Sequence, residues 1–573
     1  MPRRISKAQC REALFSLATP RPLHISDPFR ATTASIMKST WVYRVFRAIR
    51  APETKKRYSN AMFGILLVPL IQLLVAPIQM ALNSRRIDLP ASILVMVMVT
   101  ITMLFINSIC GRTSSIYSDH MKGPVDFLGR HMSFGFVASF VMLSRDHITT
   151  ATDIPRIAGA FVVTTLLSYV GSYLFAAGSY RIEQRVRGLR NRMEDVEKVA
   201  RQPQGSSGHA RRVSQIGKLT MTIANNGSFS SLETMCAPSV TVDFVVRMAP
   251  LWMSLFLLAT IGLPVYFATR YELPFETFCF VFFWVGALYF QRAIKSCKML
   301  ELQPRLRSIL TVAFNPVLVT SALATAYFWI KTAVTHRDIG DVLSGFKHHN
   351  SWASLMIQLN EDGQFTKHVG AGDLANALLD AGIVSLGFKM FEYRGELWKS
   401  FTTVFCTSLV FATMNVFINV IFSRAMGLQP AEALAFCARN VTIALGVPAV
   451  QHLDGSTTLM SALVVFSGML FQMTGDLLFS WLHINDRMVP STASSSSDSE
   501  KSCEGDGESD CKIIAAGVTV GINAAAMGTS HLIERNSKCA AYSALSMTVF
   551  GAITVALTAV PVIADVLTKL AAR

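Results

Sequence analysis

Two stretches of small and hydroxyl-bearing residues in the C-terminal third of the chain carry the residue types that could bind a small anion. The first, residues 439–448, reads RNVTIALGVP, and the second, residues 517–531, reads GVTVGINAAAMGTSH. Each is bordered by segments that are apolar enough to cross a bilayer. Irregular backbone at membrane depth is tolerated only where protein or a cavity surrounds it. Two such stretches in corresponding positions are typical of a transporter binding site.

The chemistry of these stretches suits a carboxylate or another small anion. An unwound helix exposes amide N–H groups, and a helix N-terminus carries partial positive charge. Arg439 adds a full charge and a two-pronged donor, at a depth where arginine is costly unless it faces protein, water or ligand. In the alternative interpretation, Gly, Ala and Thr only allow helices to pack closely.

The rest of the sequence predicts the elements that must position these residues. Of 573 residues, 51% are hydrophobic and 16% are charged, against about 25% charged in soluble domains. A soluble enzyme is therefore excluded. The apolar blocks predict an all-α integral membrane protein with about 12 transmembrane segments, including discontinuous helices with inverted-repeat character. The strong spans are 61–82, 90–110, 155–178, 248–269, 273–290, 308–334, 400–422, 457–481 and 540–570, and the weaker ones are 125–143, 373–391, 431–450 and 513–531.

The net charge of +16 is explained by membrane topology. Lys and Arg gather in residues 3–57, 181–218 and 292–307, and all three clusters fall on one side of the membrane if the spans are counted as above. This is the distribution that the positive-inside rule predicts. We therefore expect the lipid bilayer, and no nucleic acid, as a partner.

No motif for an enzyme, a metal or a cofactor is found. The ten cysteines show no paired metal spacing, and His336, His348, His349 and His368 share a polar loop without tight spacing. Nucleophile elbows, zinc-protease helices and phosphate-binding loops are absent from the sequence. We expect a protein that is not an enzyme, with no metal and no cofactor.

The hydrophilic segments divide the chain into four parts. Residues 1–58 form a basic leader, for which a transit peptide and a disordered tail are both open. Residues 59–180 hold four spans, and 181–245 form a hydrophilic linker whose first part, 181–201, continues the fourth span as a solvated helix. Residues 246–573 form the larger membrane domain, which contains a disordered, acidic, Ser-rich loop near 489–511.

Several motifs resemble those of the LrgB/CidB family, which includes the plant plastidial glycolate/glycerate translocator. They are RNVTIALGVPAV at 439–450, GSTTL at 455–459, ALVVFSG at 462–468, NAAAMGT at 523–529 and AYSALSM at 541–547. A fainter likeness to the LrgA/CidA partner covers DFLGRHMSFGFV at 126–137. The resemblance implies a fused protein, with an LrgA-like domain over 59–180 and an LrgB-like transport domain over 246–573.

Two departures from the family pattern bear on mechanism. Asp380-Ala381 stands where the family usually has Gly-Pro, and Ala525 stands where it has His. Histidine is the side chain that titrates near neutral pH, so a proton-linked role of this position is in doubt, with His531 as a candidate substitute. Asp380 is an intramembrane carboxylate that could pair with Arg439, carry a proton or cap a broken helix.

The function implied is secondary transport of a small monocarboxylate of the glycolate, glycerate, lactate or pyruvate class. The residues expected to line the anion site are Arg439, Asn440, Thr442, Asn523, Gly528 and Thr529. Asp380 and His531 are the candidates for charge compensation. The alternatives are a holin-like, homo-oligomeric pore or regulator of membrane integrity, and a degenerate member that does not transport. The membrane is an organelle inner membrane of mitochondrial or plastid type, or the plasma membrane.

Overall fold

The computed structural model describes residues 52–84, 90–142, 153–200, 246–297, 304–347, 369–484, 486 and 506–573, and within them the regular elements are helices, with no strand. Eleven of these helices are long and apolar enough to cross a membrane. The all-α class is therefore confirmed, and the chain is a multi-pass integral membrane protein. The leader up to residue 51, linker residues 201–245 and most of the Ser-rich loop lie outside the described residues.

The chain divides into two compact units. The first comprises residues 1–58 and 220–249, and the second comprises residues 59–219 and 250–573. In the first unit, the described contact is a hydrogen bond of 3.1 Å that the Tyr58 hydroxyl donates to the carbonyl of Val246. The second unit holds nearly all the helices, and the predicted boundary between an LrgA-like and an LrgB-like domain stays a prediction.

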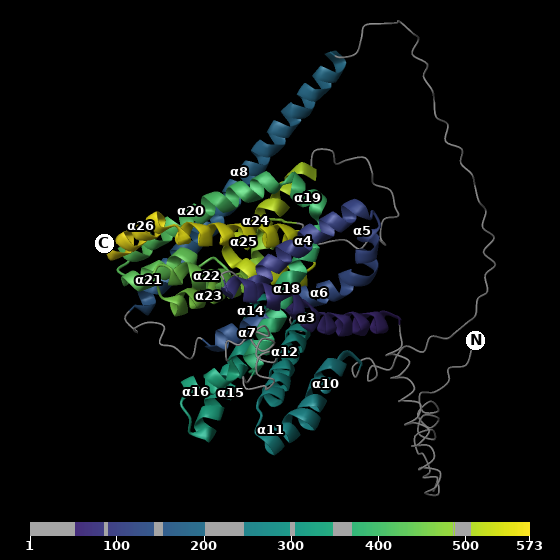
Figure 1. Cartoon of the computed structure of the whole chain (residues 1–573), viewed down its shortest axis with the longest axis vertical. Helices are drawn as coiled ribbons and strands as arrows, with labels where there is room; N and C mark the ends of the chain where they lie inside the picture. The colour runs from purple at the N-terminus through teal and green to yellow at the C-terminus, as the bar shows by residue number, and fades with distance from the viewer. Residues whose placement is uncertain are drawn as a thin grey trace, which may run out of the picture. The chain divides into compact units, whose positions relative to one another are not determined.

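Figure 1 shows the described helices in their order along the chain. Their bounds are α3 Pro52–Ser84, α4 Ala91–Ile109, α5 Thr113–Ile116, η1 Tyr117–Met121, α6 Lys122–His131, α7 Ser133–Met142, α8 Ile154–Ala200, α10 Ala249–Leu257, η2 Leu258–Gly262, α11 Leu263–Thr269, α12 Leu273–Ser296, α14 Pro304–Ala313, α15 Pro316–Thr335, α16 Ile339–Phe346, α18 Ala371–Glu392, α19 Arg394–Lys399, α20 Phe401–Ala425, α21 Pro430–Ala435, η3 Phe436–Ala438, α22 Ile443–Gln451, α23 Thr457–Trp481, α24 Asp506–Glu534, α25 Cys539–Ala559 and α26 Pro561–Ala572.

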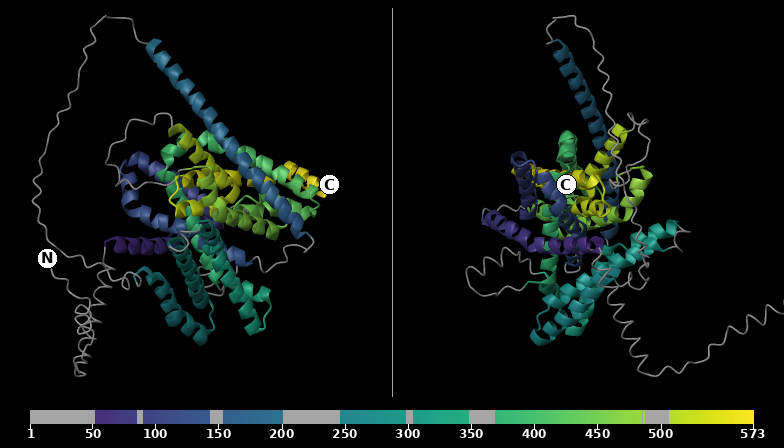
Figure 2. Two further views of the ribbon diagram at one scale, coloured as in Figure 1. Left: turned by 180° about the vertical axis from the view of Figure 1, so that it is seen from behind. Right: turned by 90° about the vertical axis from the view of Figure 1, so that its right-hand side faces the viewer.

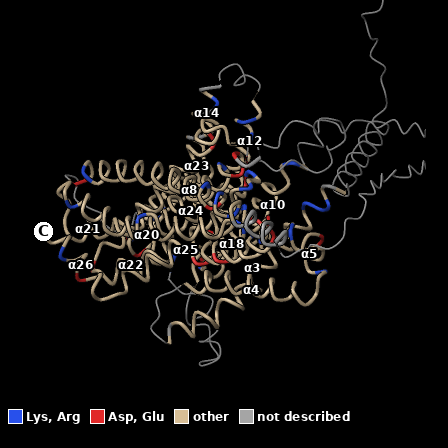
Figure 3. The backbone as a smooth tube through the Cα atoms, turned by 90° about the horizontal axis from the view of Figure 1, so that it is seen from above, with Lys and Arg blue, Asp and Glu red and all other residues tan. Residues whose placement is uncertain are grey.

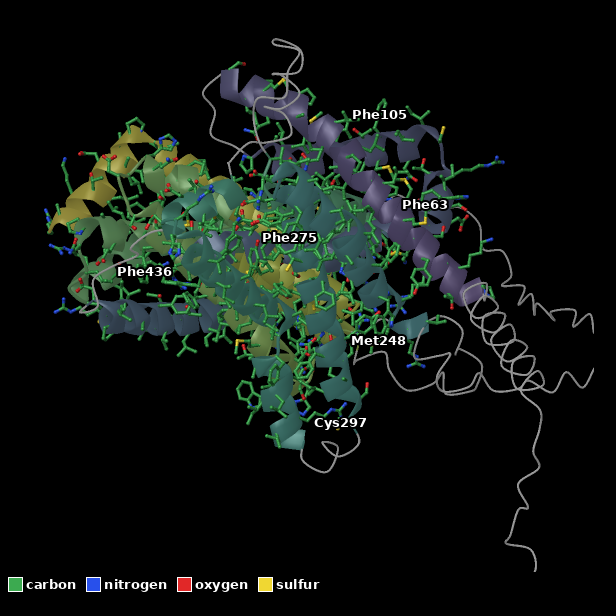
Figure 4. The ribbon with its side chains drawn as sticks, turned by 90° about the horizontal axis from the view of Figure 1, so that it is seen from below. Phe63, Phe105, Met248, Phe275, Cys297 and Phe436 are labelled. Atoms are coloured by element: carbon green, nitrogen blue, oxygen red, sulfur yellow. The ribbon has the colours of Figure 1, made fainter. Side chains whose placement is uncertain are left out.

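Burial separates core helices from helices that face lipid. In the most apolar 18-residue stretch of α24, 94% of the residues are buried. The corresponding share is 72% in α18 and 17% in α4. The outer helices expose large apolar side chains such as Phe63 on α3 and Phe105 on α4 (Figure 4). Long stretches of the backbone carry no charged residue (Figure 3). These are the surfaces that the hydrocarbon core of a bilayer covers.

Helix α8 joins the core although it belongs to the first four spans. It packs against α20 and α24 and continues past the core as one long helix (Figure 2). Since it runs to Ala200, the prediction that residues 181–201 extend the fourth span as a helix is confirmed as far as residue 200. Helix α24 begins at Asp506, so the end of the predicted disordered loop lies in a helix instead.

An ion network, rather than a pair along one helix, holds α6 against α18. Asp126 and Arg130 are four residues apart and could pair, but Asp126 contacts the Lys389 ammonium on α18. Arg130 donates to Asn536 Oδ1 over 2.6 Å. Lys389 also binds Glu392 at 2.9 Å, so these charges stabilise an interface between the early and late helices.

Close packing of α24 on α25 depends on glycine. A Cβ atom on Gly521 would lie 2.0 Å from Ser546 Oγ and 2.3 Å from the carbonyl oxygen of Ser543. The Ser546 hydroxyl also donates to the carbonyl of Val518 over 3.2 Å. Small residues that bring two backbones together are the usual basis of helix association in membranes.

We predict that Gly521→Ala lowers the melting temperature of the purified protein, because α25 must move away. Overpacking of this kind costs about 1–3 kcal/mol. Gly178→Ala is the matched control, since Gly178 also lies in a long helix and an added Cβ there meets nothing within 4 Å. Equal melting temperatures for the two variants would contradict the packing role.

Candidate functional site

Both predicted stretches break a helix, which confirms the discontinuous helices. Between η3 and α22, residues 439–442 leave the helical path, and α22 begins again at Ile443 with Thr442 as its N-cap. The carbonyl of Thr442 accepts from the amides of Leu445 and Gly446. In α24 the break is a single residue, Ala525, with φ 46° and ψ −135°.

Arg439 is buried completely and has no counter-ion among the described residues. Its exposed fraction is 0%, and Nη1 donates to Thr165 Oγ1 over 2.8 Å. The guanidinium also lies 5.8 Å from the ring centre of Phe161. Its Nε and Nη2 atoms have no hydrogen-bond partner among the described residues, and no carboxylate there forms an ion pair with it. A cation held in this way is costly unless an anion binds it.

The two broken helices meet through a pair of asparagines. Asn440 Nδ2 donates to Asn523 Oδ1 over 3.2 Å and to Ser168 Oγ over 3.2 Å. Asn523 Nδ2 donates to Ser172 Oγ over 3.0 Å and to the carbonyl of Thr519 over 2.9 Å. The stretches that are far apart in the sequence therefore form one polar centre.

Helix α8 supplies the third side of this centre through Thr165, Ser168 and Ser172. Their spacing of three and four residues places them on one helix face. These positions were missed in the sequence, although hydroxyl residues recur along the fourth span. Such residues usually bond their own backbone, as Ser172 does with the carbonyl of Ser168 at 2.6 Å, so the pattern alone does not indicate a site.

Several buried polar atoms in this centre have no partner within the described chain. We define the Arg439 cluster as the residues that hold these atoms together with the asparagine that links them. Its members are Arg439, Asn440, Thr442, Tyr169, Thr519 and Asn523. The free atoms are Nε and Nη2 of Arg439, the hydroxyls of Thr442, Tyr169 and Thr519, and Oδ1 of Asn440. Unpaired donors outnumber the one unpaired amide oxygen, so the cluster suits a ligand that accepts hydrogen bonds.

Gly528 and Thr529 follow the break but face other neighbours. The Thr529 hydroxyl bonds the carbonyl of Ala525 at 2.9 Å and Ser543 Oγ on α25 at 2.7 Å. A Cβ atom on Gly528 would lie 2.5 Å from Ala524 Cβ. These two residues hold the second half of α24 in place, and the structure does not bring their side-chain positions into hydrogen bonds with the cluster.

Asp380 lies apart from Arg439. Its carboxylate is hydrogen-bonded to Ser92 and Gln72 on the outer helices α4 and α3, so the expected pair with Arg439 does not form. It does not cap a broken helix either, because α18 runs unbroken across Asp380 and Ala381. The N-terminus of α18 is capped by Asp373, whose Oδ2 accepts from the amide of Gly370 at 3.1 Å.

His531 also lies outside the Arg439 cluster. Its Nε2 is 3.2 Å from Asp476 Oδ1, and its ring meets the ring of Phe471 edge-on with centres 5.9 Å apart. Arg535 binds the same Asp476 oxygen at 2.6 Å. Within the residues that the structure describes, no group of three His, Cys, Asp or Glu side chains could hold a metal ion.

The part of the chain that holds this site is similar to a known family. The model of the LrgB-like family matches residues 301–497 and 511–565. The C-terminal part of this chain is similar to that family. The matched residues contain both broken helices, and the resemblance seen in the sequence is confirmed there. No solved structure matches the chain.

Curated relatives fall into two groups. The plastidal glycolate/glycerate translocator 1 of Arabidopsis thaliana is 26% identical over 129 residues, which are 22% of this chain. The match spans only 25% of that translocator. The holin-like protein CidB of Staphylococcus epidermidis is 21% identical over 197 residues, which cover 34% of this chain and 75% of the relative. These names support a membrane transporter or a holin-like role.

We predict that Ala525→Gly raises the melting temperature. Backbone strain at a non-glycine residue with positive φ costs about 1–3 kcal/mol, whereas glycine costs about 0.5–1 kcal/mol in chain entropy, so the net gain is about 1 kcal/mol. Ala524→Gly, one residue earlier and in helical conformation, should lower the melting temperature. If both variants melt below the parent protein, the strain at Ala525 is not relieved by glycine and the prediction is wrong.

Proposed function

We propose that this protein is a secondary transporter of small monocarboxylates, of the glycolate, glycerate, lactate or pyruvate class, and that the anion binds at the Arg439 cluster. The observation that carries the proposal is the buried guanidinium with two free donor atoms and no counter-ion in the described chain. A carboxylate has the charge and the two-pronged geometry to bind such a guanidinium.

The surroundings of Arg439 support a small ligand. The hydroxyls of Thr442, Tyr169 and Thr519 are unpaired and buried, and can donate to the oxygens of a carboxylate or to a neighbouring hydroxyl or keto group. Broken helices at membrane depth hold substrates in many secondary transporters. One relative is named a glycolate/glycerate translocator, which agrees with this substrate class.

The proposal predicts that Arg439→Met lowers transport without lowering stability. Uptake of labelled glycolate, lactate or pyruvate into proteoliposomes should fall at least tenfold, because a hydrogen-bonded charge contributes about 1.5–3 kcal/mol. Without substrate the variant should melt no lower than the parent protein, because an unpaired buried cation is removed. Substrate should raise the melting temperature of the parent protein only.

Arg156→Gln is the matched control. Arg156 lies on α8, the helix that supplies Thr165 to Arg439. Its side chain is 54% exposed and paired with Asp153 at 3.0 Å, so its loss should leave uptake unchanged. Uptake of these acids by Arg439→Met at the level of the parent protein would contradict the assignment of the site. Absence of flux for every one of these acids in the parent protein would sink the transport proposal itself.

The holin-like alternative rests on the names of the bacterial relatives. It predicts leak of dyes or ions from proteoliposomes without saturation by any carboxylate. A closed, dye-tight liposome with saturable uptake favours the transporter.

The alternative of a degenerate, non-transporting protein rests on Ala525. The variant Ala525→His distinguishes it from the transporter, because a gain of transport on restoring the imidazole would show that the parent protein had lost transport.

A further inference from the structure

Three polar side chains lie in a line along α20, a helix long and apolar enough to cross a membrane. Asn415, Asn419 and Ser423 are spaced four residues apart, so they share one face of the helix. All three are buried, and the exposed fraction of Asn415 is 6%. Polar side chains at membrane depth are costly unless they find partners, so the hydrogen bonds of each residue in this line indicate what it does.

Two residues of the line hold the backbone of the segment that leads to Arg439. The Ser423 hydroxyl donates to the carbonyl of Ala433 over 3.4 Å. Asn419 Nδ2 donates to the carbonyl of Phe436 over 3.3 Å. A step of four residues back along α20 therefore corresponds to three residues forward along α21 and η3.

Asn415 is the next residue in this register. It lies one turn before Asn419, and Arg439 lies three residues after Phe436, so the same spacing places Asn415 level with Arg439. Asn415 Oδ1 accepts from Asn419 Nδ2 over 3.5 Å. This bond fixes the orientation of the amide, because the reversed amide would set two donors against each other.

The amide nitrogen of Asn415 is a buried donor that is left free. Its Nδ2 atom has no hydrogen-bond partner within the described chain. Since Oδ1 is held on the side of Asn419, Nδ2 is directed away from that residue. A free donor of this kind calls for a ligand or water that brings an acceptor.

Contacts between α20 and α8 place Asn415 at the same level independently. The rings of Phe411 and Phe175 lie 6.0 Å apart, and a Cβ atom on Gly159 would lie 3.4 Å from Met426 Cε. The two helices are therefore antiparallel, and Asn415, on the same face as Phe411, falls between these two contacts. This is the height at which α8 presents its hydroxyls to the Arg439 cluster.

We propose that Asn415 is a further ligand-binding residue of this site, and that it selects acids with an oxygen atom on the carbon next to the carboxylate. Nε and Nη2 of Arg439 suit the two oxygens of the carboxylate itself. The Asn415 amide is neutral, so it adds a hydrogen bond without further charge, and Nδ2 donates to the neighbouring hydroxyl or keto oxygen. An acid without that oxygen leaves the buried donor unpaired, which is the kind of loss that discriminates between similar ligands.

Helix α20 thus supplies a fourth side of the site, next to the two broken helices and α8. The inference rests on the proposed function for the ligand class. The position of Asn415 rests on the two registers, one with η3 and one with α8.

The first test uses the full-length parent protein and measures the binding of lactate, pyruvate and propionate by calorimetry. The acids share one carbon skeleton, and propionate alone lacks the second oxygen function. We expect lactate and pyruvate to bind about fivefold more tightly than propionate, as one hydrogen bond to a buried group implies. Equal affinity for the three acids would overturn the proposal without any substitution.

The second test assigns the preference to Asn415. Asn415→Leu, which has a similar volume, should weaken lactate and pyruvate about fivefold and leave propionate unchanged. Asn415→Ala removes the amide without added bulk, should have the same effect, and keeps the test open if Asn415→Leu does not fold. A merely structural loss would weaken all three acids alike.

Thr413→Val is the matched control on the same helix. The Thr413 hydroxyl bonds the carbonyl of Leu409 over 3.0 Å, within α20 itself and on an exposed face. Valine keeps the shape of threonine, so this variant should retain the preference of the parent protein.

The outcomes separate this residue from the proposed function. If the parent protein prefers lactate and pyruvate but the Asn415 variants keep that preference, the role of Asn415 is overturned and the Arg439 cluster stands. If the variants lose the preference but the parent protein shows no uptake into proteoliposomes, the role of Asn415 stands and the transport proposal fails. Absence of binding for every acid in the parent protein overturns both.

Discussion

The arrangement of the core depends on one constraint, a guanidinium that is buried with no counter-ion in the described chain. A buried charge must be hydrogen-bonded and approached by an opposite charge, or its cost falls on folding. Arg439 obtains one protein hydrogen bond, from Nη1 to Thr165, and keeps two nitrogen atoms free in the described chain. Helix η3 ends just before it, α22 starts shortly after it, and α8 and α24 supply polar side chains to Arg439 and its neighbour Asn440. Within the described chain, the two free nitrogen atoms are left for a ligand or water to satisfy.

The side of the cluster that α8 supplies ties the early spans to the late ones. Thr165, Ser168 and Ser172 on that helix bond to Arg439, Asn440 and Asn523 respectively. The ion network of Asp126 and Lys389 joins the two groups of helices again at α6 and α18. Each hydroxyl accepts a hydrogen bond from a buried donor that would otherwise need water. Helix α8 therefore helps to position the residues of the Arg439 cluster.

The break in α24 shows how the site is held without a titrating group at its centre. Ala525 adopts a positive φ that favours glycine, and the Thr529 hydroxyl bonds its carbonyl. His531, the residue that could have replaced an imidazole at this position, is instead paired with Asp476. Asp380 also lies outside the Arg439 cluster, with Gln72 and Ser92 as its hydrogen-bond partners. Among the described residues, the charge of the Arg439 cluster thus comes from Arg439 alone.

The sequence by itself predicted the class of protein, most of the spans and the two broken stretches. It also singled out Arg439, Asn440 and Asn523 as candidate site residues. These follow from local rules, since apolar length, glycine content and a charge inside a span act over a few residues. Only the tertiary structure decided which partners these residues have. Asp380 could have faced Arg439, Thr529 could have faced the anion, and the hydroxyls of α8 could have bonded only their own helix. Contacts between residues hundreds of positions apart depend on how the helices rotate and cross. Close packing, such as that of Gly521 against Ser546, sets this rotation. A hydropathy pattern carries no information about such packing.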